Sequence, residues 1–125
     1  MFKILVCGGR NFNDKDFLFQ SLDDFVETLR GSVIPMADPP KIRIISGGAR
    51  GADTLAAIYA RERGCGLKIY PAEWGLWGNA AGPIRNQRML EEENPDVVFA
   101  FRGGKGTFDM ISKSKRQGFK VIECS

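Results

Sequence analysis

The sequence predicts a three-layer α/β sandwich around a mostly parallel sheet of about five strands. Three times a short β-rich run leads into a pair of glycines with a basic residue one to three positions away. Each run is followed by residues with helical spacing, and alternating strands and helices are typical of parallel βα units. The length also fits, because 125 residues suit one domain, residues 1–125, that is large enough to bury a core.

Each expected strand is rich in β-branched and aromatic residues. The strands are residues 3–7, 42–45, 67–70, 97–101 and 120–123. Apolar residues at helical spacing predict the helices between them, and Gly31, Gly64 and Asn94 follow three of these. The expected helices are residues 17–29, 51–63, 83–93 and 107–117. Residues 32–41 contain three prolines and are expected to be irregular, as are the glycine- and tryptophan-rich residues 72–82.

Composition excludes several classes of chemistry. The chain has no histidine, which removes Ser-His, Cys-His and His-metal sites. Three scattered cysteines without CxxC spacing predict neither a disulfide framework nor a metal site, and no cofactor is expected. A net charge of +3 without a basic run permits a nucleic-acid partner without requiring one. No apolar run reaches membrane-spanning length and no signal peptide begins the chain, so we expect a cytoplasmic protein without a membrane partner.

The three glycine loops carry the main functional signal. In a parallel sheet the carboxyl ends of the strands lie along one edge, so the loops should meet there. Glycine lets backbone N–H groups approach a ligand, and a following helix N-terminus attracts anions. We therefore predict a composite pocket for a phosphate-bearing ligand, although tight strand-to-helix packing would also require glycines. The loop residues concerned are Gly8, Gly9, Arg10, Ser46, Gly47, Gly48, Arg50, Gly51, Gly103, Gly104, Lys105, Gly106 and Thr107.

Three side chains of the helix starts have two interpretations each. Asp53 either caps its helix or accepts a ribose hydroxyl. Thr107 is either an N-cap or a phosphate donor, since both roles use the same hydroxyl. Asp109 falls in the expected first helical turn, where an acidic residue is favoured, and is also a candidate catalytic acid or base with Glu73 as its rival. Trp74, in the loop after Glu73, would either stack on a base or cover the core.

The segment that begins at Pro83 adds a cationic signal. Arg85 and Arg88 are three residues apart, so they share a face near the start of a helix. Cations there oppose the helix dipole, at a cost of about 0.3–1 kcal/mol each. An anion beside them, from a ligand or from an acidic side chain, would offset this cost. Asn86 shares its face with Met89 and is expected to be partly buried and bonded to a loop backbone.

Taken together, these motifs resemble the YspA-type (cpYpsA-related) branch of the SLOG superfamily over nearly the whole chain. The motifs that carry the resemblance are Gly8-Gly9-Arg10, Ser46-Gly47-Gly48-Ala49-Arg50-Gly51-Ala52-Asp53, Pro71-Ala72-Glu73-Trp74, Ala81-Gly82-Pro83-Ile84-Arg85-Asn86-Gln87-Arg88-Met89 and Gly103-Gly104-Lys105-Gly106-Thr107. The resemblance implies a Rossmann-like fold that binds a nucleotide or nucleotide-derived ligand, such as ADP-ribose, NAD or a purine nucleotide, for sensing or sequestering it.

Two relatives of this branch imply alternatives. The Lonely Guy and lysine-decarboxylase-like phosphoribohydrolases carry a PGGxGTxxE motif. In this chain Arg102 stands in place of the proline, and Asp109 and Met110 occupy the two positions after Phe108 where that family shows Glu-Glu. They imply hydrolysis of an N-glycosidic bond, with Asp109 or Glu73 as the carboxylate and Arg85 holding the phosphate. The DNA-processing protein DprA resembles residues 48–53 and Arg85-Asn86, and it implies single-stranded DNA binding.

Oligomeric state has only one sequence signal. The aromatic residues near the first helix offer more apolar surface than one face of a sheet needs, which makes a homodimer an open prediction. These residues are Phe12, Phe17, Phe19 and Phe25.

Overall fold

The computed structural model describes residues 1–31 and 41–124 of the chain. Their elements, in order, are β1 (Phe2–Cys7), α1 (Lys15–Gly31), β2 (Ile42–Ser46), α2 (Ala52–Arg63), β3 (Gly66–Ile69), α3 (Trp74–Trp77), a 3₁₀ turn (Gly78–Ala80), α4 (Ala81–Glu93), β4 (Val97–Phe101), α5 (Lys105–Arg116) and β5 (Val121–Cys124). The five strands pair in parallel in the order β3-β2-β1-β4-β5. The predicted parallel α/β fold of about five strands is confirmed.

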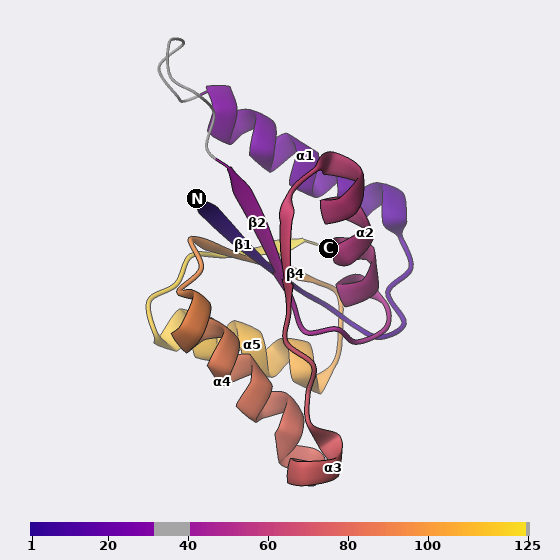
Figure 1. Cartoon of the computed structure of the whole chain (residues 1–125), viewed down its shortest axis with the longest axis vertical. Helices are drawn as coiled ribbons and strands as arrows, with labels where there is room; N and C mark the ends of the chain where they lie inside the picture. The colour runs from indigo at the N-terminus through magenta and orange to yellow at the C-terminus, as the bar shows by residue number, and fades with distance from the viewer. Residues whose placement is uncertain (32–40, 125) are drawn as a thin grey trace.

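Helices cover both faces of this sheet, as Figure 1 shows, with α1 and α2 on one side and α4 and α5 on the other. Alternation along the strands explains why both faces are apolar. On β1, Ile4 and Val6 belong to the core under α1 and α2, whereas Leu5 and Cys7 belong to the core under α4 and α5. All four side chains are buried, so β1 is the centre of both cores.

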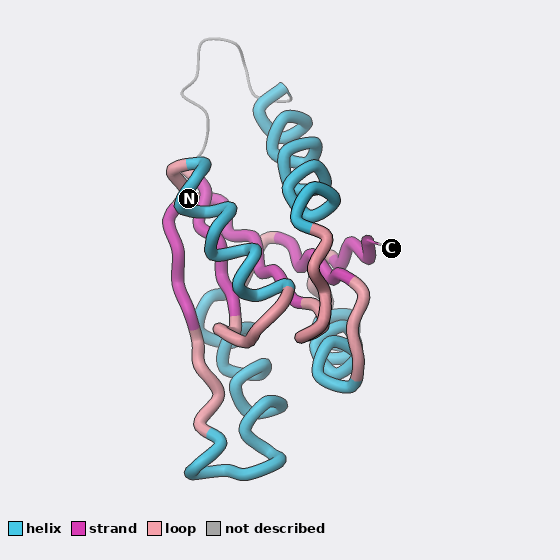
Figure 2. The backbone as a smooth tube through the Cα atoms, turned by 90° about the vertical axis from the view of Figure 1, so that its right-hand side faces the viewer, coloured by secondary structure: helices cyan, strands magenta, loops and turns pink. Residues whose placement is uncertain are grey.

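The strand order places a topological switch point between β1 and β4. The chain leaves β1 through α1 toward β2, whereas it leaves β4 through α5 toward β5, on the opposite face of the sheet. The connections that follow β1 and β4 therefore run to opposite faces of the sheet, and Figure 2 shows helices on either side of the strands. In open α/β sheets such an edge is where ligands bind.

The prediction of an irregular loop over residues 72–82 is wrong. Residues Trp74–Trp77 form one helical turn, and the carbonyl of Glu73 accepts the N–H groups of Leu76 and Trp77 at 3.0 Å. The following helix begins at Ala81, two residues before Pro83. This start is possible because N–H groups in the first turn of a helix have no partner within it, so a proline there costs no hydrogen bond.

The start of the last helix was also placed too late in the sequence analysis. Helix α5 begins at Lys105 with Gly104 as its N-cap residue, so Thr107 lies in the first turn and is not the cap. Asp109 consequently lies beyond the first turn. The irregular connection expected at residues 32–41 falls outside the described residues except for Lys41.

The aromatic residues near α1 pack within the chain. Phe12 and Phe19 are buried, and Phe17 and Phe25 are partly buried against the same core. The apolar surplus that motivated a homodimer is therefore absorbed by this sheet face, and the dimer stays a prediction without that support. Among the described residues, none of the helices has the length and apolar character needed to cross a bilayer.

Candidate functional site

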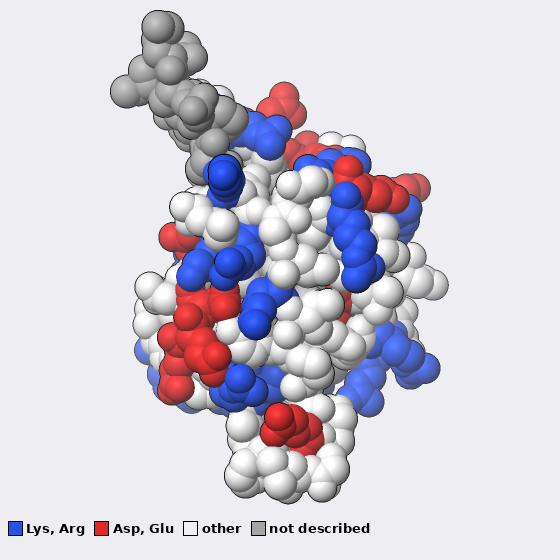
Figure 3. Space-filling model, in the orientation of Figure 1, with Lys and Arg blue, Asp and Glu red and all other residues white. Residues whose placement is uncertain are grey.

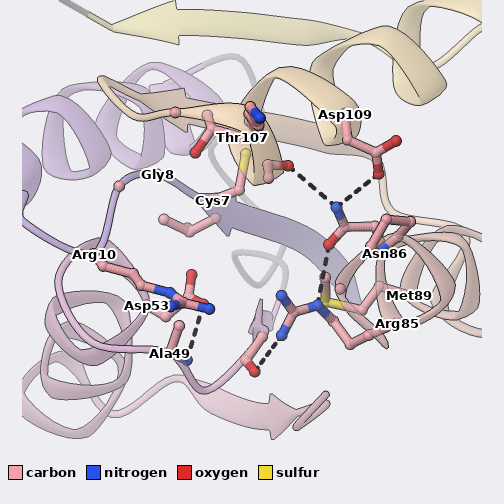
Figure 4. A pocket seen from close by; sticks show the side chains of 18 of the residues that line it. Cys7, Gly8, Arg10, Ala49, Asp53, Arg85, Asn86, Met89, Thr107 and Asp109 are labelled. Atoms are coloured by element: carbon pink, nitrogen blue, oxygen red, sulfur yellow. Dashed lines mark hydrogen bonds between the residues drawn. The ribbon is translucent and has the colours of Figure 1, made fainter. Parts of the chain in front are cut away.

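A cavity of about 590 Å³ opens at the switch point, beside the carboxyl ends of β1, β2 and β4. Figure 4 shows side chains from the β1, β2 and β4 sides and from α4 pointing toward one space. The sequence-predicted residues that line it are Gly8, Gly9, Arg10, Gly47, Asp53, Trp74, Arg85, Asn86, Gly104, Lys105, Gly106, Thr107 and Asp109. A smaller hollow of about 290 Å³ adjoins it, shares Gly9, Arg10 and Gly104, and includes the predicted Gly103.

Six predicted residues line neither space. Ser46 is fully buried, and its hydroxyl donates to the carbonyl of Asp53 at 3.2 Å. Arg88 is exposed, donates to Glu92 at 2.9 Å, and lies over the ring of Tyr70. The remaining four are Gly48, Arg50, Gly51 and Glu73.

Close packing between loops accounts for several of the glycines. A Cβ on Gly51, which has a φ of 78°, would collide with the carbonyl of Gly9 and with the backbone of Arg10. A Cβ on Gly9 would lie 2.9 Å from the Cα of Gly103, and the Gly9 N–H donates to the Arg102 carbonyl at 2.9 Å. These contacts join the three glycine loops into one unit, which we call the loop junction and define as Gly8, Gly9, Gly51 and Gly103.

Arg85 connects the cavity to the β2–α2 loop. Its Nη1 donates to the Gly47 carbonyl at 2.6 Å and to the Tyr70 carbonyl at 3.3 Å, and its Nε donates to Asn86 at 3.0 Å. No acidic side chain among the described residues lies within the 4.0 Å of an ion pair with Arg85. Burial lowers the pKa of Arg85, and the charge of Arg10 across the cavity lowers it further while the Asp53 charge raises it.

Asn86 extends this network toward α5. It is buried, with 4% of its surface exposed, and its Nδ2 donates to the Gly106 carbonyl at 3.2 Å and to Asp109 at 3.0 Å. The expected burial and backbone bond are therefore present, but the prediction of a loop acceptor is wrong, since Gly106 lies in the first turn of α5. Asp109 also accepts bonds of 2.8 and 3.0 Å from Lys113. The carboxylate of Asp109 thus lines the cavity with both oxygens engaged.

Asp53, the second carboxylate of the cavity, is more buried than Asp109 and accepts a hydrogen bond from a loop backbone. It is buried to 7% exposure, and its Oδ2 accepts the Ala49 N–H at 3.0 Å. The predicted cap of α2 is wrong, since the N-cap residue Gly51 has no side-chain hydrogen bond and Asp53 bonds backward into the loop. Burial raises the pKa of Asp53 to about 6, against the opposing effects of the Ala49 hydrogen bond and the Arg85 charge.

The start of α5 forms the opposite wall. Thr107 is buried to 6% exposure, and its hydroxyl has no hydrogen-bond partner among the described residues. Gly104 and Gly106 have open space where a Cβ would stand. The unbonded N–H groups of a helix start and its dipole favour an anion at such a place.

The mouth of the cavity carries one aromatic contact. The Arg10 guanidinium lies 5.4 Å from the centre of the Trp74 ring, and both residues line the cavity. Trp74 is 47% exposed, so one part of the indole is available to a ligand. Trp77 does not line the cavity.

Sequence reasoning missed several lining residues. These are Val6, Cys7, Asn11, Ala49, Asn79, Gly82, Pro83 and Met89. Cys7 is buried and forms no disulfide, and burial raises the pKa of its thiol. The ion pair between Lys113 and Asp109 could have been predicted, because Lys113 follows Asp109 at the i+4 position of a helix.

The fold and this cavity define a class of protein, namely a Rossmann-like α/β protein with a cation-lined crevice at its switch point. The chain belongs to the YspA, cpYpsA-related SLOG family, which matches residues 2–77. This family was predicted from the sequence motifs, and it favours a nucleotide-related function.

The proteins to which this chain is similar include a phage protein and a DNA-processing protein. The Gene 61 protein of Mycobacterium phage D29 is 29% identical over 129 residues, which cover 98% of this chain and 95% of that protein. The X-ray structure of DNA processing protein A (DprA) from Streptococcus pneumoniae matches with a TM-score of 0.46 and 19% identity. That match covers 98% of this chain but 58% of the DprA chain, so this chain spans little more than half of DprA.

Proposed function

We propose that this protein binds a nucleotide or nucleotide-derived ligand, such as a purine nucleotide, ADP-ribose or NAD, in the switch-point cavity, to sense or sequester it. The observation that carries the proposal is the charge of the cavity wall. Arg10, Arg85 and Lys105 line it without an ion-pair partner among the described residues, whereas Asp109 is paired with Lys113. Asp53 alone offsets this charge, so an anion is needed to balance the wall.

The first turn of α5 is the expected place for a phosphate. Thr107 offers an unengaged hydroxyl there, and Gly104 and Gly106 leave space for a ligand close to the backbone. Backbone N–H groups at a helix start bind phosphate oxygens by the same geometry in many α/β proteins. The side chain of Lys105 adds a positive charge at this end.

A base would lie nearer the mouth, beside Trp74. The indole stands against Arg10, and an aromatic ring with a guanidinium beside it suits the face of a purine. A cavity of about 590 Å³ is within the usual size range of small-molecule sites. Figure 3 shows Lys and Arg interspersed with Asp and Glu on the face drawn there, which favours a local site over an extended basic track on that face.

Thermal denaturation tests the proposal. The panel is AMP, GMP, ADP-ribose, NAD, inorganic phosphate and a short single-stranded oligonucleotide. A ligand present at a hundredfold its Kd adds about 2.7 kcal/mol to the free energy of unfolding, which should raise Tm by about 8–16 °C. Arg10→Ala should abolish the shift, because it removes a positive charge from the cavity wall. The Arg10 side chain makes no hydrogen bond with the described residues, so the fold should stay intact. Arg88→Ala is the matched control and should keep the shift.

The outcomes separate the alternatives. A shift with a nucleotide that survives Arg10→Ala would contradict this site. A shift with the oligonucleotide alone, falling steeply with salt, would replace the proposal with single-stranded DNA binding, since each phosphate contact adds to the salt dependence. No shift with any nucleotide would overturn the proposal.

A second candidate is hydrolysis of the N-glycosidic bond of a nucleoside monophosphate. The observation that favours it is that Asp109 and Arg85 line one cavity and are joined through Asn86. A carboxylate near the sugar would stabilise the positive charge that develops in such a reaction. Release of free base from AMP or GMP, lost in Asp109→Asn with binding retained, would support hydrolysis. If the nucleotide stays intact after prolonged incubation, hydrolysis is excluded and only the proposal of binding remains.

A further inference from the structure

One carboxylate of the cavity has an unused oxygen. Asp53 Oδ2 accepts the Ala49 N–H, whereas no hydrogen bond to Oδ1 occurs among the described residues. The side chain is buried, lines the cavity, and lies in Figure 4 on the wall opposite Asn86 and Asp109. A buried charged group with one hydrogen bond is unfavourable, so a donor that reaches Oδ1 would be worth more here than at the surface.

The cation nearest to this carboxylate does not satisfy it. Arg85 and Asp53 approach the same side of Gly47, since a Cβ on Gly47 would strike the Arg85 guanidinium and lie 3.0 Å from Asp53 Oδ2. Arg85 directs Nη1 at the Gly47 carbonyl instead, and no ion pair within 4.0 Å joins the two side chains. The arrangement leaves a negative group open to the cavity with a positive group held beside it.

We propose that Asp53 accepts hydrogen bonds from the 2′- and 3′-hydroxyls of a ribose, and that the cavity therefore selects ribonucleotides over 2′-deoxyribonucleotides. This inference rests on the proposed nucleotide-binding function. An ionised carboxylate is an acceptor only, and a vicinal diol presents two donors side by side, so the two groups are complementary. The edge of a base presents both donors and acceptors, and an amide side chain would suit it better.

The placement of Asp53 relative to α5 fits a nucleoside phosphate. Asp53 stands beside the end of β2 and Thr107 beside the end of β4, with β1 between the two strands. Neighbouring strands are about 4.8 Å apart, so the ends of β2 and β4 lie about 10 Å from each other. A nucleotide with its 5′-phosphate bonded at one end and its diol bonded at the other bridges such a span. The carboxylate also repels phosphate, which orients the ligand with its phosphate at α5.

Calorimetric titration of matched nucleotide pairs tests this. The pairs are AMP with 2′-deoxy-AMP and GMP with 2′-deoxy-GMP, on the wild-type chain and on Asp53→Asn. In the wild type the ribonucleotide should bind about 10- to 100-fold more tightly, the range of a hydrogen bond to a charged group. Asp53→Asn should reduce this ratio to about threefold or less. The asparagine keeps an oxygen that can accept the Ala49 N–H. The control is Asp16→Asn, which changes an exposed carboxylate of α1 and should keep the wild-type ratio.

Each outcome bears on the inference separately from the proposed function. Equal affinity for the ribo and deoxy forms in the wild type would overturn the selection of ribose while leaving nucleotide binding in place. A ratio retained in Asp53→Asn would overturn the assignment to Asp53. An absence of binding by all four nucleotides would overturn both proposals together. The wild-type ratio does not depend on whether the variant folds, and circular dichroism checks the fold of Asp53→Asn.

Discussion

The loop junction and the cavity wall are built from the same three loops, yet glycine serves opposite purposes in them. In the junction, Gly9, Gly51 and Gly103 are glycines because another backbone occupies the place of a side chain. On the cavity wall, Gly104 and Gly106 have open space in that place. A glycine pair with a nearby basic residue therefore does not by itself indicate a phosphate contact. The position of the neighbouring loops decides which glycines meet protein and which meet ligand.

The two regions also differ in what they contribute to stability. The junction joins loops through close packing and through the hydrogen bond from Gly9 to Arg102, so substitutions there should only lose stability. Among the described residues, the cavity wall holds cations without an ion-pair partner and a buried carboxylate with one hydrogen bond, so some substitutions there should gain stability. Function commonly retains groups of this destabilising kind.

The largest effect is expected in the junction. Gly51→Ala should lower the free energy of unfolding by about 3 kcal/mol or more, because it combines a left-handed backbone with a collision against the Gly9 carbonyl. Gly64→Ala is the control, since Gly64 has a φ of 69° but open space around its Cβ position. It should cost only the backbone strain, about 1–2 kcal/mol. Urea denaturation measures both, and equal losses would mean that the collision is relieved by movement of the loops.

The next effect tests the cavity wall through pH. Asp53 has a pKa of about 6 in the folded chain against an ordinary 3.8, so the folded state holds this proton more tightly than the unfolded state. The stability contributed by Asp53 is then fully present below about pH 4 and is lost as the pH rises to about 6, a loss of about 3 kcal/mol at most. Asp53→Asn removes this dependence and should be about 1–3 kcal/mol more stable than the wild type at pH 7.

The measurement is the Tm of the wild type and of Asp53→Asn between pH 4 and pH 7. The advantage of Asp53→Asn should shrink toward pH 4, where the wild-type carboxyl is protonated. Asp16→Asn, which changes an exposed residue of α1, is the control variant in these measurements. A variant that is less stable than the wild type at pH 7 would show that the negative charge of Asp53 stabilises the wall, through Arg85, more than burial penalises it.

The fold was largely predictable because its strands are continuous apolar runs. Strand Val97–Phe101 was placed to the residue, and the other strands within one residue at each end. The errors concern helix boundaries: α4 and α5 begin two residues earlier than predicted, and α1 extends two residues further at each end and includes Gly31. Helix α3 consists of Trp-Gly-Leu-Trp, and α5 begins with residues of low or mixed helix propensity, so local composition argued against both. The boundaries of these helices depend on packing against the rest of the fold and on backbone hydrogen bonds, and local composition does not predict either.

The sequence predicted the location of the candidate site, but not the direction in which individual side chains point. The carboxyl edge of a parallel sheet brings the three loops together wherever the strands are correct. Arg85 and Arg88 share one helix face in the sequence, but the rotation of α4 on the sheet directs Arg85 to the cavity and Arg88 to Glu92. The pairing of Asp109 with Lys113 distinguishes it from Asp53, and no local pattern shows which of two carboxylates will be the buried one.

The smallest stability effect is expected at the open glycines, where it should be opposite in sign to the effect on binding. Gly106→Ala places a methyl group in the first turn of α5, where no described atom beyond its chain neighbours and its own helix backbone lies within 4 Å, and should stabilise the chain by up to about 1 kcal/mol. The same methyl stands on the cavity wall, so nucleotide affinity should fall at least threefold.

Gly75→Ala is the control, because Gly75 lies in α3 with equally open space and does not line the cavity. It should leave affinity unchanged in calorimetric titration with AMP. Unchanged affinity in Gly106→Ala would mean that the ligand does not approach the start of α5, and the phosphate would then have to lie nearer Arg10 and the smaller hollow.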